Sequence, residues 1–243
     1  RKGLTLAQAR ARILDPLYYA LMMLRSGRAD ALVAGEEMNY PDAVRPALEV
    51  IGVEAGHKTV AAIYMMVFPT QTFFFADCTM NIDPDAETLA EVAGITARFV
   101  WHLGIEPQIA MLSFSNFGSV RDEQAAKVAR AVALLHEREP ALAVDGEMQA
   151  DTAVVDRILK RRYPFARLRG PANVLIFPDL NAANISYKLL ARLGGAEAIG
   201  PILVGMAQPV QVLQRGADVN EIVNLAVIAA VEAQERVRPP VTS

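Results

Sequence analysis

The chain of 243 residues contains a single cysteine, Cys78, and three histidines that lie far apart. One thiol cannot form an internal disulfide, and the histidines show no metal-ligand spacing. We expect Cys78 to be a buried structural thiol. No apolar segment reaches the roughly 18 residues that a membrane helix requires, and the longest run, "TVAAIYMMVF" at positions 59–68, is strand-sized. These absences predict a cytoplasmic protein without a membrane segment or a metal site.

Neither sign of charge dominates. There are 24 basic against 27 acidic residues, which gives a formal net charge of −3. The strongly basic balance that is typical of nucleic-acid-binding proteins is therefore absent. Apolar residues make up 53% of the chain, and the mean hydropathy is positive, which favours strands buried on both faces. We expect Trp101 and the methionine pairs at positions 22–23 and 65–66 in the core.

Strand-like and helix-like segments alternate along the chain. Apolar runs predict strands at positions 29–35, 59–68, 72–77, 108–114, 142–148, 173–178 and 198–205. Apolar spacing predicts helices at positions 6–27, 40–52, 83–104, 122–138, 149–162, 181–195 and 218–236. We expect Thr5 to cap the first helix, Pro16 and Pro46 to interrupt helices, and 59–68 to form a hairpin with 72–77. The alternation predicts an α/β fold with a mainly parallel sheet.

Small polar residues follow several predicted strands, and ligands usually bind at the carboxyl ends of parallel strands. The strand that carries Ser113 is followed by the loop "SNFGS", which contains Ser115, Asn116, Gly118 and Ser119. Hydroxyls and free N–H groups near a glycine and a helix N-terminus suit a phosphate. The loop fits equally well a plain helix start that is capped by Ser119 or Asp122.

A second polar group follows the strand at 173–178. Asp179, Asn181 and Asn184 lie within six residues, and one of them is enough to cap the next helix. Asn184 is expected beside Lys188, four residues further along the same helix face. These side chains either line one edge of a cleft or form a solvated helix start.

A third polar loop contains Gln214 and Arg215. Arg215 is the best single candidate for an anion contact because its guanidinium presents a fork of donors, although a surface arginine is the commoner outcome. Arg45 is a second candidate, with a surface ion pair as its default role. Asp218 and Glu221 have the spacing of a capping box, and capping is the favoured role for Glu221.

Seven ordered blocks resemble the phosphate acetyltransferase/butyryltransferase family, and together they span nearly the whole chain. They read "GRADALVAGE", "FADCTMNIDPDAETLAEVA", "GIEPQIAMLSFSNFGS", "VDGEMQADTAV", "GPANVLIFPDLNAANISYKLL", "AIGPILVG" and "EIVNLAVIAAVEAQ". The resemblance implies two α/β/α subdomains with mainly parallel sheets that flank a cleft, similar to the isocitrate dehydrogenase type. We expect residues 1–55 plus 203–243 to form the smaller subdomain and residues 56–202 the larger one. Because family members carry an additional N-terminal α/β segment, we also expect this chain to be a piece of a longer polypeptide.

Two members of the family differ at the third loop. In the free-standing transferase, which moves an acetyl group between coenzyme A and phosphate, this loop reads N-D-L-S-R-G and is followed by an aspartate base. Here it reads "QVLQRG", with Gln214 in the serine position, Arg215 retained and Glu221 in the aspartate position. The loss of the short hydroxyl, together with "SNFGS" and "DGEM", resembles instead the transferase-like C-terminal domain of the large bacterial NADP-dependent malic enzyme.

The resemblance therefore implies a regulatory domain without catalytic residues, which binds acetyl-CoA as an allosteric ligand and inhibits malate decarboxylation. It implies a homodimer, a higher oligomer in the full-length enzyme, and NADP and a divalent metal (Mg or Mn) only in the absent malic-enzyme domain. The residues expected to line the acetyl-CoA site are Arg45, Ser113, Ser115, Asn116, Gly118, Ser119, Asp179, Asn181, Asn184, Lys188, Gln214, Arg215 and Glu221. The alternative is an active phosphate acetyl- or butyryltransferase, with Arg215 on phosphate and Glu221 as the base.

Overall fold

The computed structural model describes residues 3–237. Their contacts group the chain into two compact units. Unit 1 combines the chain up to Lys58 with the chain from Gly205 onward, and unit 2 is the continuous segment Thr59–Val204. That these units act as subdomains with the expected boundaries remains a prediction.

Unit 1 contains two short strands packed with helices. The helices are α1 (Leu6–Arg12), α2 (Pro16–Arg25), α3 (Tyr40–Val50) and α9 (Val219–Val237). The strands β1 (Leu32–Ala34) and β8 (Val210–Val212) pair in parallel. Our sequence analysis placed β8 in a loop, because Gln208, Gln211 and Gln214 interrupt the apolar residues there and leave no apolar run.

The helix ends of unit 1 follow local sequence signals. Thr5 accepts a hydrogen bond from the backbone of Gln8, whose side chain accepts one from the backbone of Thr5, so the predicted cap is confirmed. Asp15 caps α2 at Pro16, which confirms the predicted break. The expected interruption at Pro46 is wrong, because α3 continues through it. A proline removes one helical hydrogen bond, and packing of the buried face of α3 against α2 offsets that loss.

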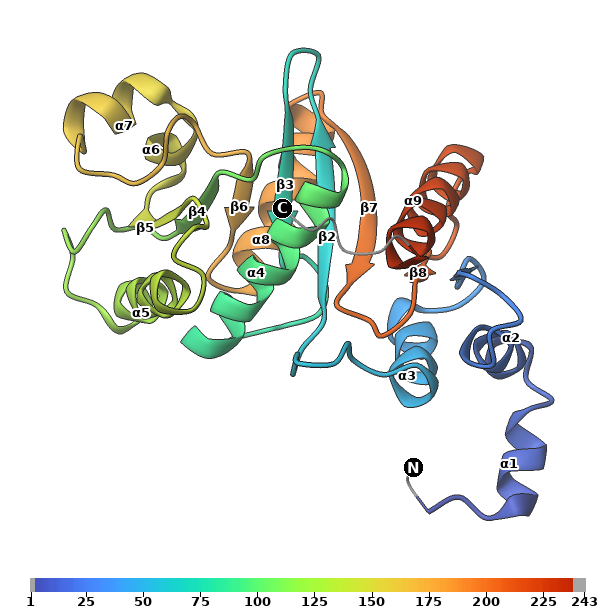
Figure 1. Cartoon of the computed structure of the whole chain (residues 1–243). Helices are drawn as coiled ribbons and strands as arrows, with labels where there is room; N and C mark the ends of the chain where they lie inside the picture. The colour runs from blue at the N-terminus through green and yellow to red at the C-terminus, as the bar shows by residue number, and fades with distance from the viewer. Residues whose placement is uncertain (1–2, 238–243) are drawn as a thin grey trace. The chain divides into compact units, whose positions relative to one another are not determined.

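Unit 2 is built on a six-stranded sheet with the order β5-β4-β6-β3-β2-β7. The strands are β2 (Ala61–Val67), β3 (Thr72–Ala76), β4 (Ile109–Leu112), β5 (Val144–Met148), β6 (Val174–Ile176) and β7 (Glu197–Val204). β5, β4, β6 and β3 are mutually parallel, and β2 runs antiparallel to both β3 and β7. The predicted hairpin is therefore confirmed, as is the α/β class with a mainly parallel sheet (Figure 1).

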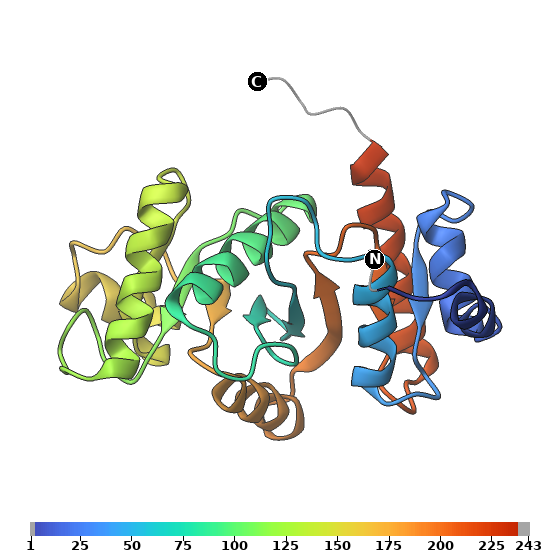
Figure 2. The same ribbon diagram turned by 90° about the horizontal axis from the view of Figure 1, so that it is seen from below.

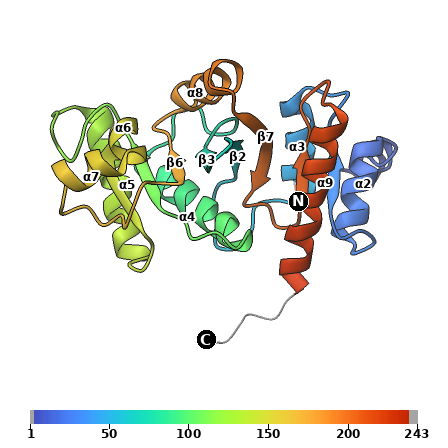
Figure 3. The ribbon, with the colours of Figure 1, turned by 90° about the horizontal axis from the view of Figure 1, so that it is seen from above.

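Helices cover both faces of this sheet (Figures 2 and 3). They are α4 (Ala86–His102), α5 (Glu123–Arg138), α6 (Ala150–Val154), α7 (Asp156–Arg162) and α8 (Leu180–Leu193). α4 and α5 lie on one face, and α6, α7 and α8 lie on the other. The single helix expected at 149–162 is two helices, which meet at Val155 in an extended conformation.

The core of unit 2 lies between the sheet and these helices. Its largest fully buried side chains include Phe74, Ile63, Met66, Ile109, Met111 and Ile176. Trp101, expected in the core, is 61% exposed at the end of α4, and Met22 and Met23 are also exposed. Cys78 is buried as expected, and burial raises the pKa of its thiol. None of the helices within residues 3–237 has the length and apolarity needed to cross a membrane.

Candidate functional site

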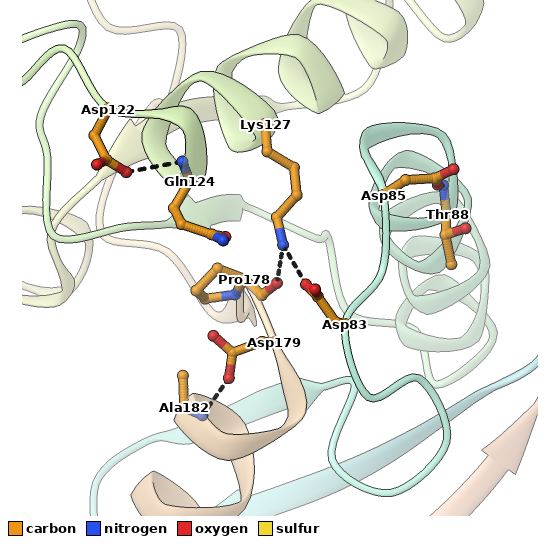
Figure 4. Close-up of polar contacts among 9 residues, drawn as sticks. All are labelled: Asp83, Asp85, Thr88, Asp122, Gln124, Lys127, Pro178, Asp179 and Ala182. Atoms are coloured by element: carbon orange, nitrogen blue, oxygen red, sulfur yellow. Dashed lines mark hydrogen bonds and ion pairs between the residues drawn. The ribbon is translucent and has the colours of Figure 1, made fainter.

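The loops after β3, β4 and β6 meet at the carboxyl edge of the unit 2 sheet, as the parallel arrangement requires. The backbone N–H of Leu180 donates to the carbonyl of Ile82 at 3.0 Å, which joins the loop after β6 to the loop after β3. The Lys127 Nζ on α5 forms an ion pair with Asp83 at 2.9 Å and donates to the carbonyl of Pro178 at 3.1 Å (Figure 4). Our sequence analysis missed Lys127, because its partners lie 44 and 51 residues away.

The third polar loop does not share this edge. Gln214 and Arg215 follow β8, a strand of the separate two-stranded sheet in unit 1. The three polar loops therefore do not lie at one sheet edge, because the chain leaves the larger sheet after β7 and forms another strand before the third loop.

Asp77 organises the loop after β3. Its Oδ1 accepts hydrogen bonds from the backbone N–H groups of Ala62, Thr79 and Met80, and its Oδ2 accepts two from Asn81. The side chain is buried, and burial raises the pKa of this carboxyl, an effect that the hydrogen bonds oppose. Since all five contacts come from donors, the group acts as an acceptor only.

The "SNFGS" loop is held by a buried carboxylate, that of Glu147 on β5, which is 3% exposed. Glu147 Oε1 accepts hydrogen bonds from the Ser115 hydroxyl and the Gly118 N–H, both at 2.7 Å, and its backbone carbonyl accepts from the Phe117 N–H. The Asn116 N–H donates to the Ser119 hydroxyl at 2.9 Å. The N–H groups that we expected to face a phosphate thus have acceptors within the protein. The loop is therefore preorganised, and the carboxylate of Glu147 accepts the hydrogen bonds that we expected a phosphate to accept.

A second set of contacts fixes the same loop from the end of β5. Asn116 Nδ2 donates to Gln149 Oε1, and the Gln149 N–H donates back to Asn116 Oδ1, both at 2.9 Å. The Ser115 N–H lies 3.3 Å from the Ser113 hydroxyl, which therefore belongs to the same network. The charged residues inside the otherwise apolar segment "VDGEM" were the available sequence signal for this clamp.

A cavity lies beside this loop. It has a volume of about 580 Å³. It is lined by Gly118, Val120, Arg121, Asp122, Glu123, Ala125, Ala126, Ala129 and Glu147. Three carboxylates and one guanidinium line it, so the wall favours a neutral group with hydrogen-bond donors over a phosphate. Asp122 caps α5 through the Gln124 N–H at 2.8 Å, as one reading of the sequence predicted (Figure 4).

The polar group after β6 divides into separate roles. Asp179 caps α8 by accepting from the Ala182 N–H at 2.9 Å (Figure 4). Asn184 Nδ2 lies 3.5 Å from the carbonyl of Cys78, while the Lys188 ammonium lies over the Tyr187 ring at 5.4 Å. The side chain of the exposed Asn181 has no hydrogen-bond partner among the described residues. Capping therefore accounts for Asp179, and Asn184 and Lys188 both lie in α8 with the expected spacing of four residues.

In unit 1, the predicted capping box is confirmed. Glu221 Oε2 accepts from the Asp218 N–H and Asp218 Oδ1 accepts from the Glu221 N–H, each at 2.9 Å. Gln214 and Arg215 are exposed in the loop after β8, and Arg45 is exposed on α3. The Arg215 guanidinium has no partner among the described residues, so its donors are available to an anion.

Unit 1 also contains a buried polar pair that sequence reasoning missed. Gln211 on β8 is fully buried and donates from Nε2 to Glu232 on α9 at 2.7 Å. Although part of Glu232 reaches solvent, burial raises the pKa of its carboxyl to about 7, while Gln211 and Arg236 act in the opposite direction.

Glu232→Gln should stabilise the protein above pH 7. The pKa of Glu232 is raised in the folded protein, so folding favours the protonated side chain. Its contribution to the free energy of unfolding is therefore fully present below the pKa that Glu232 has in the unfolded chain, and it is lost as the pH rises through about 7. The amide keeps an acceptor for Gln211 and removes the charge, so we expect a gain of about 1–3 kcal/mol at pH 8.5 and little change at pH 4.5. Thermal unfolding at both pH values measures this. Glu37→Gln, at an exposed site, is the control, and equal shifts in both variants would contradict the prediction.

Comparison with known proteins identifies relatives across nearly the whole chain. Residues 1–230 match the family described as phosphate acetyl/butaryl transferase. A phosphate acetyltransferase from Acetivibrio thermocellus is 45% identical over 240 residues, which cover 96% of this chain and 72% of that protein. One from Bacillus subtilis is 43% identical over 234 residues, with the same coverage. A phosphotransacetylase structure from Streptococcus pyogenes superimposes with a TM-score of 0.91 at 40% identity, covering 95% of this chain and 71% of that one.

These relatives correct the functional part of our sequence analysis. The family is confirmed, but the interpretation as a regulatory malic-enzyme domain is wrong, because the relatives are phosphate acetyltransferases. The same relatives contradict three expectations that depended on this interpretation. These are the oxidoreductase activity, the NADP and divalent metal of a malic-enzyme domain, and a purely allosteric role for acetyl-CoA. The wrong interpretation rested on the substitution at Gln214 together with "SNFGS" and "DGEM", whereas the identity to phosphate acetyltransferases extends over 96% of the chain.

Proposed function

The chain belongs to the phosphate acetyl/butaryl transferase family, and from this we propose that it catalyses the reversible transfer of an acetyl group between coenzyme A and inorganic phosphate. The observation that carries the proposal is the 45% identity to a phosphate acetyltransferase over 96% of the chain. Arg215 adds support, because its guanidinium has no partner within residues 3–237 and its fork of donors suits a phosphate dianion.

In the proposed reaction, the coenzyme A sulfur attacks the carbonyl carbon of acetyl phosphate. The carbon–sulfur bond forms, the bond from the carbonyl carbon to the phosphate oxygen breaks, and phosphate leaves with that electron pair. Arg215 binds the phosphate and stabilises the charge that grows on it. Glu221 uses Oε2 to cap α9 and keeps Oε1 to accept the thiol proton. Acetyl-CoA is thus the product in this direction and a substrate in the reverse direction, and the reaction as written requires no metal.

Unit 2 supplies the proposed contacts to coenzyme A. The preorganised loop of Ser115, Asn116, Gly118 and Ser119 borders the cavity whose wall accepts neutral donors, and the pantetheine arm carries amide N–H groups of that kind. Ser113, Asp179, Asn181, Asn184 and Lys188 at the sheet edge, and Arg45 and Gln214 in unit 1, remain proposed ligand contacts.

A direct assay tests the proposed function. Purified protein is mixed with acetyl phosphate and coenzyme A, and thioester formation is followed. The reverse reaction is followed as acetyl phosphate made from acetyl-CoA and phosphate. We expect turnover in both directions. Absence of turnover with acetyl, propionyl and butyryl substrates, in protein that is folded by circular dichroism, would reject the proposal.

We propose further that the chain forms a homodimer through α8. Ile185, Leu189 and Leu193 are exposed at successive turns of this helix and form an apolar stripe. A cavity of about 330 Å³ with mainly apolar walls lies beside it and includes Leu190 in its lining. Exposed apolar patches of this kind are typical of interfaces, and a stable interface covers about 800 Å² per partner.

Leu189→Glu should convert the dimer to a monomer, because it places a charge in the apolar stripe. Sedimentation equilibrium measures the mass of both forms. Trp101→Glu changes an equally exposed residue on α4 and should leave the mass at that of two chains. A monomeric wild type, or a dimeric Leu189→Glu variant, contradicts the proposed interface.

A further inference from the structure

A basic segment begins in the last turn of α7, the second of the two short helices on one face of the unit 2 sheet. Residues 160–169 contain Lys160, Arg161, Arg162, Arg167 and Arg169 within ten positions of a chain whose net charge is −3. Lys160 forms an ion pair with Asp156, and Arg169 lies 3.7 Å from Glu106. The side chains of Arg161, Arg162 and Arg167 are exposed and have no partner among the described residues. Three guanidinium groups in this segment thus have no acceptor among the described residues.

Aromatic rings lie within the same segment. Phe117, Tyr163 and Phe165 form a cluster, with ring centroids 5.0 Å, 5.1 Å and 6.1 Å apart. Phe165 packs edge-on against both other rings and is 66% exposed. An exposed ring that is held by two neighbours loses little freedom when a flat ligand stacks on it.

The segment is fixed to the sheet. The backbone N–H of Arg167 donates to Asp145 Oδ2 at 2.6 Å, and that of Arg169 donates to Gln108 Oε1 at 3.1 Å. Leu168, between them, is buried. The free arginines therefore project from an anchored backbone.

The ordinary explanations cover only part of this surface. Cations in the last turn of α7 complement the helix dipole, which accounts for Lys160, Arg161 and Arg162. The dipole does not extend to Arg167, which lies five residues past the helix. It also gives no reason to expose Phe165, since an isolated apolar ring at the surface gains nothing from water.

We propose that this basic segment binds the phosphorylated adenosine end of coenzyme A. The purine stacks on Phe165, and the phosphates are bound by Arg161, Arg162 and Arg167. Phe117 belongs to the "SNFGS" loop, so the surface is continuous with the candidate site. One exposed ring offers one stacking platform, whereas proteins that bind single strands present a series of them. The inference rests on the proposed function for its ligand, but it makes its own binding prediction.

Calorimetry with 3′-phosphoadenosine 5′-diphosphate as the probe tests the site without any need for turnover. We expect Phe165→Ala to weaken binding about 5- to 10-fold, through lost stacking, and the pair Arg161→Glu and Arg162→Glu to weaken it more than 10-fold. Trp101→Ala and Arg28→Glu, at exposed sites elsewhere, should leave the affinity unchanged. Unchanged affinity in the Phe165 and arginine variants, or no binding to the wild type, overturns the inference. Tighter binding of a thymidine oligonucleotide at the same residues overturns it as well.

Kinetics separate this inference from the proposed function. The same variants should raise KM for coenzyme A and leave kcat unchanged, and they should have no effect when pantetheine, which lacks the nucleotide, replaces coenzyme A. Turnover that is insensitive to these changes rejects the nucleotide site and keeps the transferase. Probe binding that is lost in the variants, in a protein without turnover, rejects the transferase and keeps the nucleotide site.

Discussion

Asp77→Ala should destabilise unit 2 by about 3–5 kcal/mol, enough to unfold much of the protein at 37 °C. Asp77 accepts five hydrogen bonds inside the sheet edge, and alanine leaves their donors without an acceptor. Each buried donor left unsatisfied costs about 1–3 kcal/mol, and water entering the space recovers part of the total. Urea unfolding followed by circular dichroism gives the change in unfolding free energy.

Two variants make this expectation specific. Asp77→Asn retains the Oδ1 acceptor but turns an NH₂ group towards the two donors of Asn81, so it should cost less than alanine and still more than a lost cap. Asp122→Ala removes a cap with one hydrogen bond and should cost about 1 kcal/mol. An Asp77→Ala protein as stable as Asp122→Ala would show that the network is replaced by water.

Local signals account for the parts of the fold that the sequence predicted. The Thr5 cap, the Asp218–Glu221 box and the Asp179 cap each join residues three apart. The hairpin of β2 and β3 follows from two apolar runs with a short turn between them. Such features depend on residues that are close together along the chain, so they can be predicted from the local sequence pattern.

The candidate site was less predictable, because its contacts join distant residues. Ser115 meets Glu147 across 32 positions, and Asp77 reaches Ala62 across 15. The composition of "SNFGS" fitted a phosphate and a capped helix start equally well, and the anion that this loop binds in the structure is the side chain of Glu147. Trp101 illustrates the converse: its size favoured the core, but its place at the last turn of α4 leaves it exposed.

Arg215→Ala should lower kcat/KM for acetyl phosphate about 100- to 1,000-fold, the usual loss when one preorganised donor to a transition-state charge is removed. The loop after β8 is held without this side chain, since the Gly216 N–H donates to the carbonyl of Glu36 at 3.1 Å and the Ala217 N–H to that of Gln214 at 3.1 Å. Thermal stability should therefore stay unchanged. Steady-state kinetics and thermal unfolding on the same preparations measure both quantities.

Companion variants identify what the loop contributes. Arg215→Lys keeps the charge and loses the fork, so its activity should fall between those of the wild type and alanine. Gln214→Ser restores the short hydroxyl of the family pattern and should lower KM for phosphate, because a serine occupies less of the space that the phosphate needs. Arg28→Ala, at an exposed site in the same unit, should match the wild type. If the Arg215→Ala enzyme keeps an activity within twofold of the wild type, this loop does not bind the phosphate. The next candidates for phosphate binding are then the cations of unit 2, first of all Lys127.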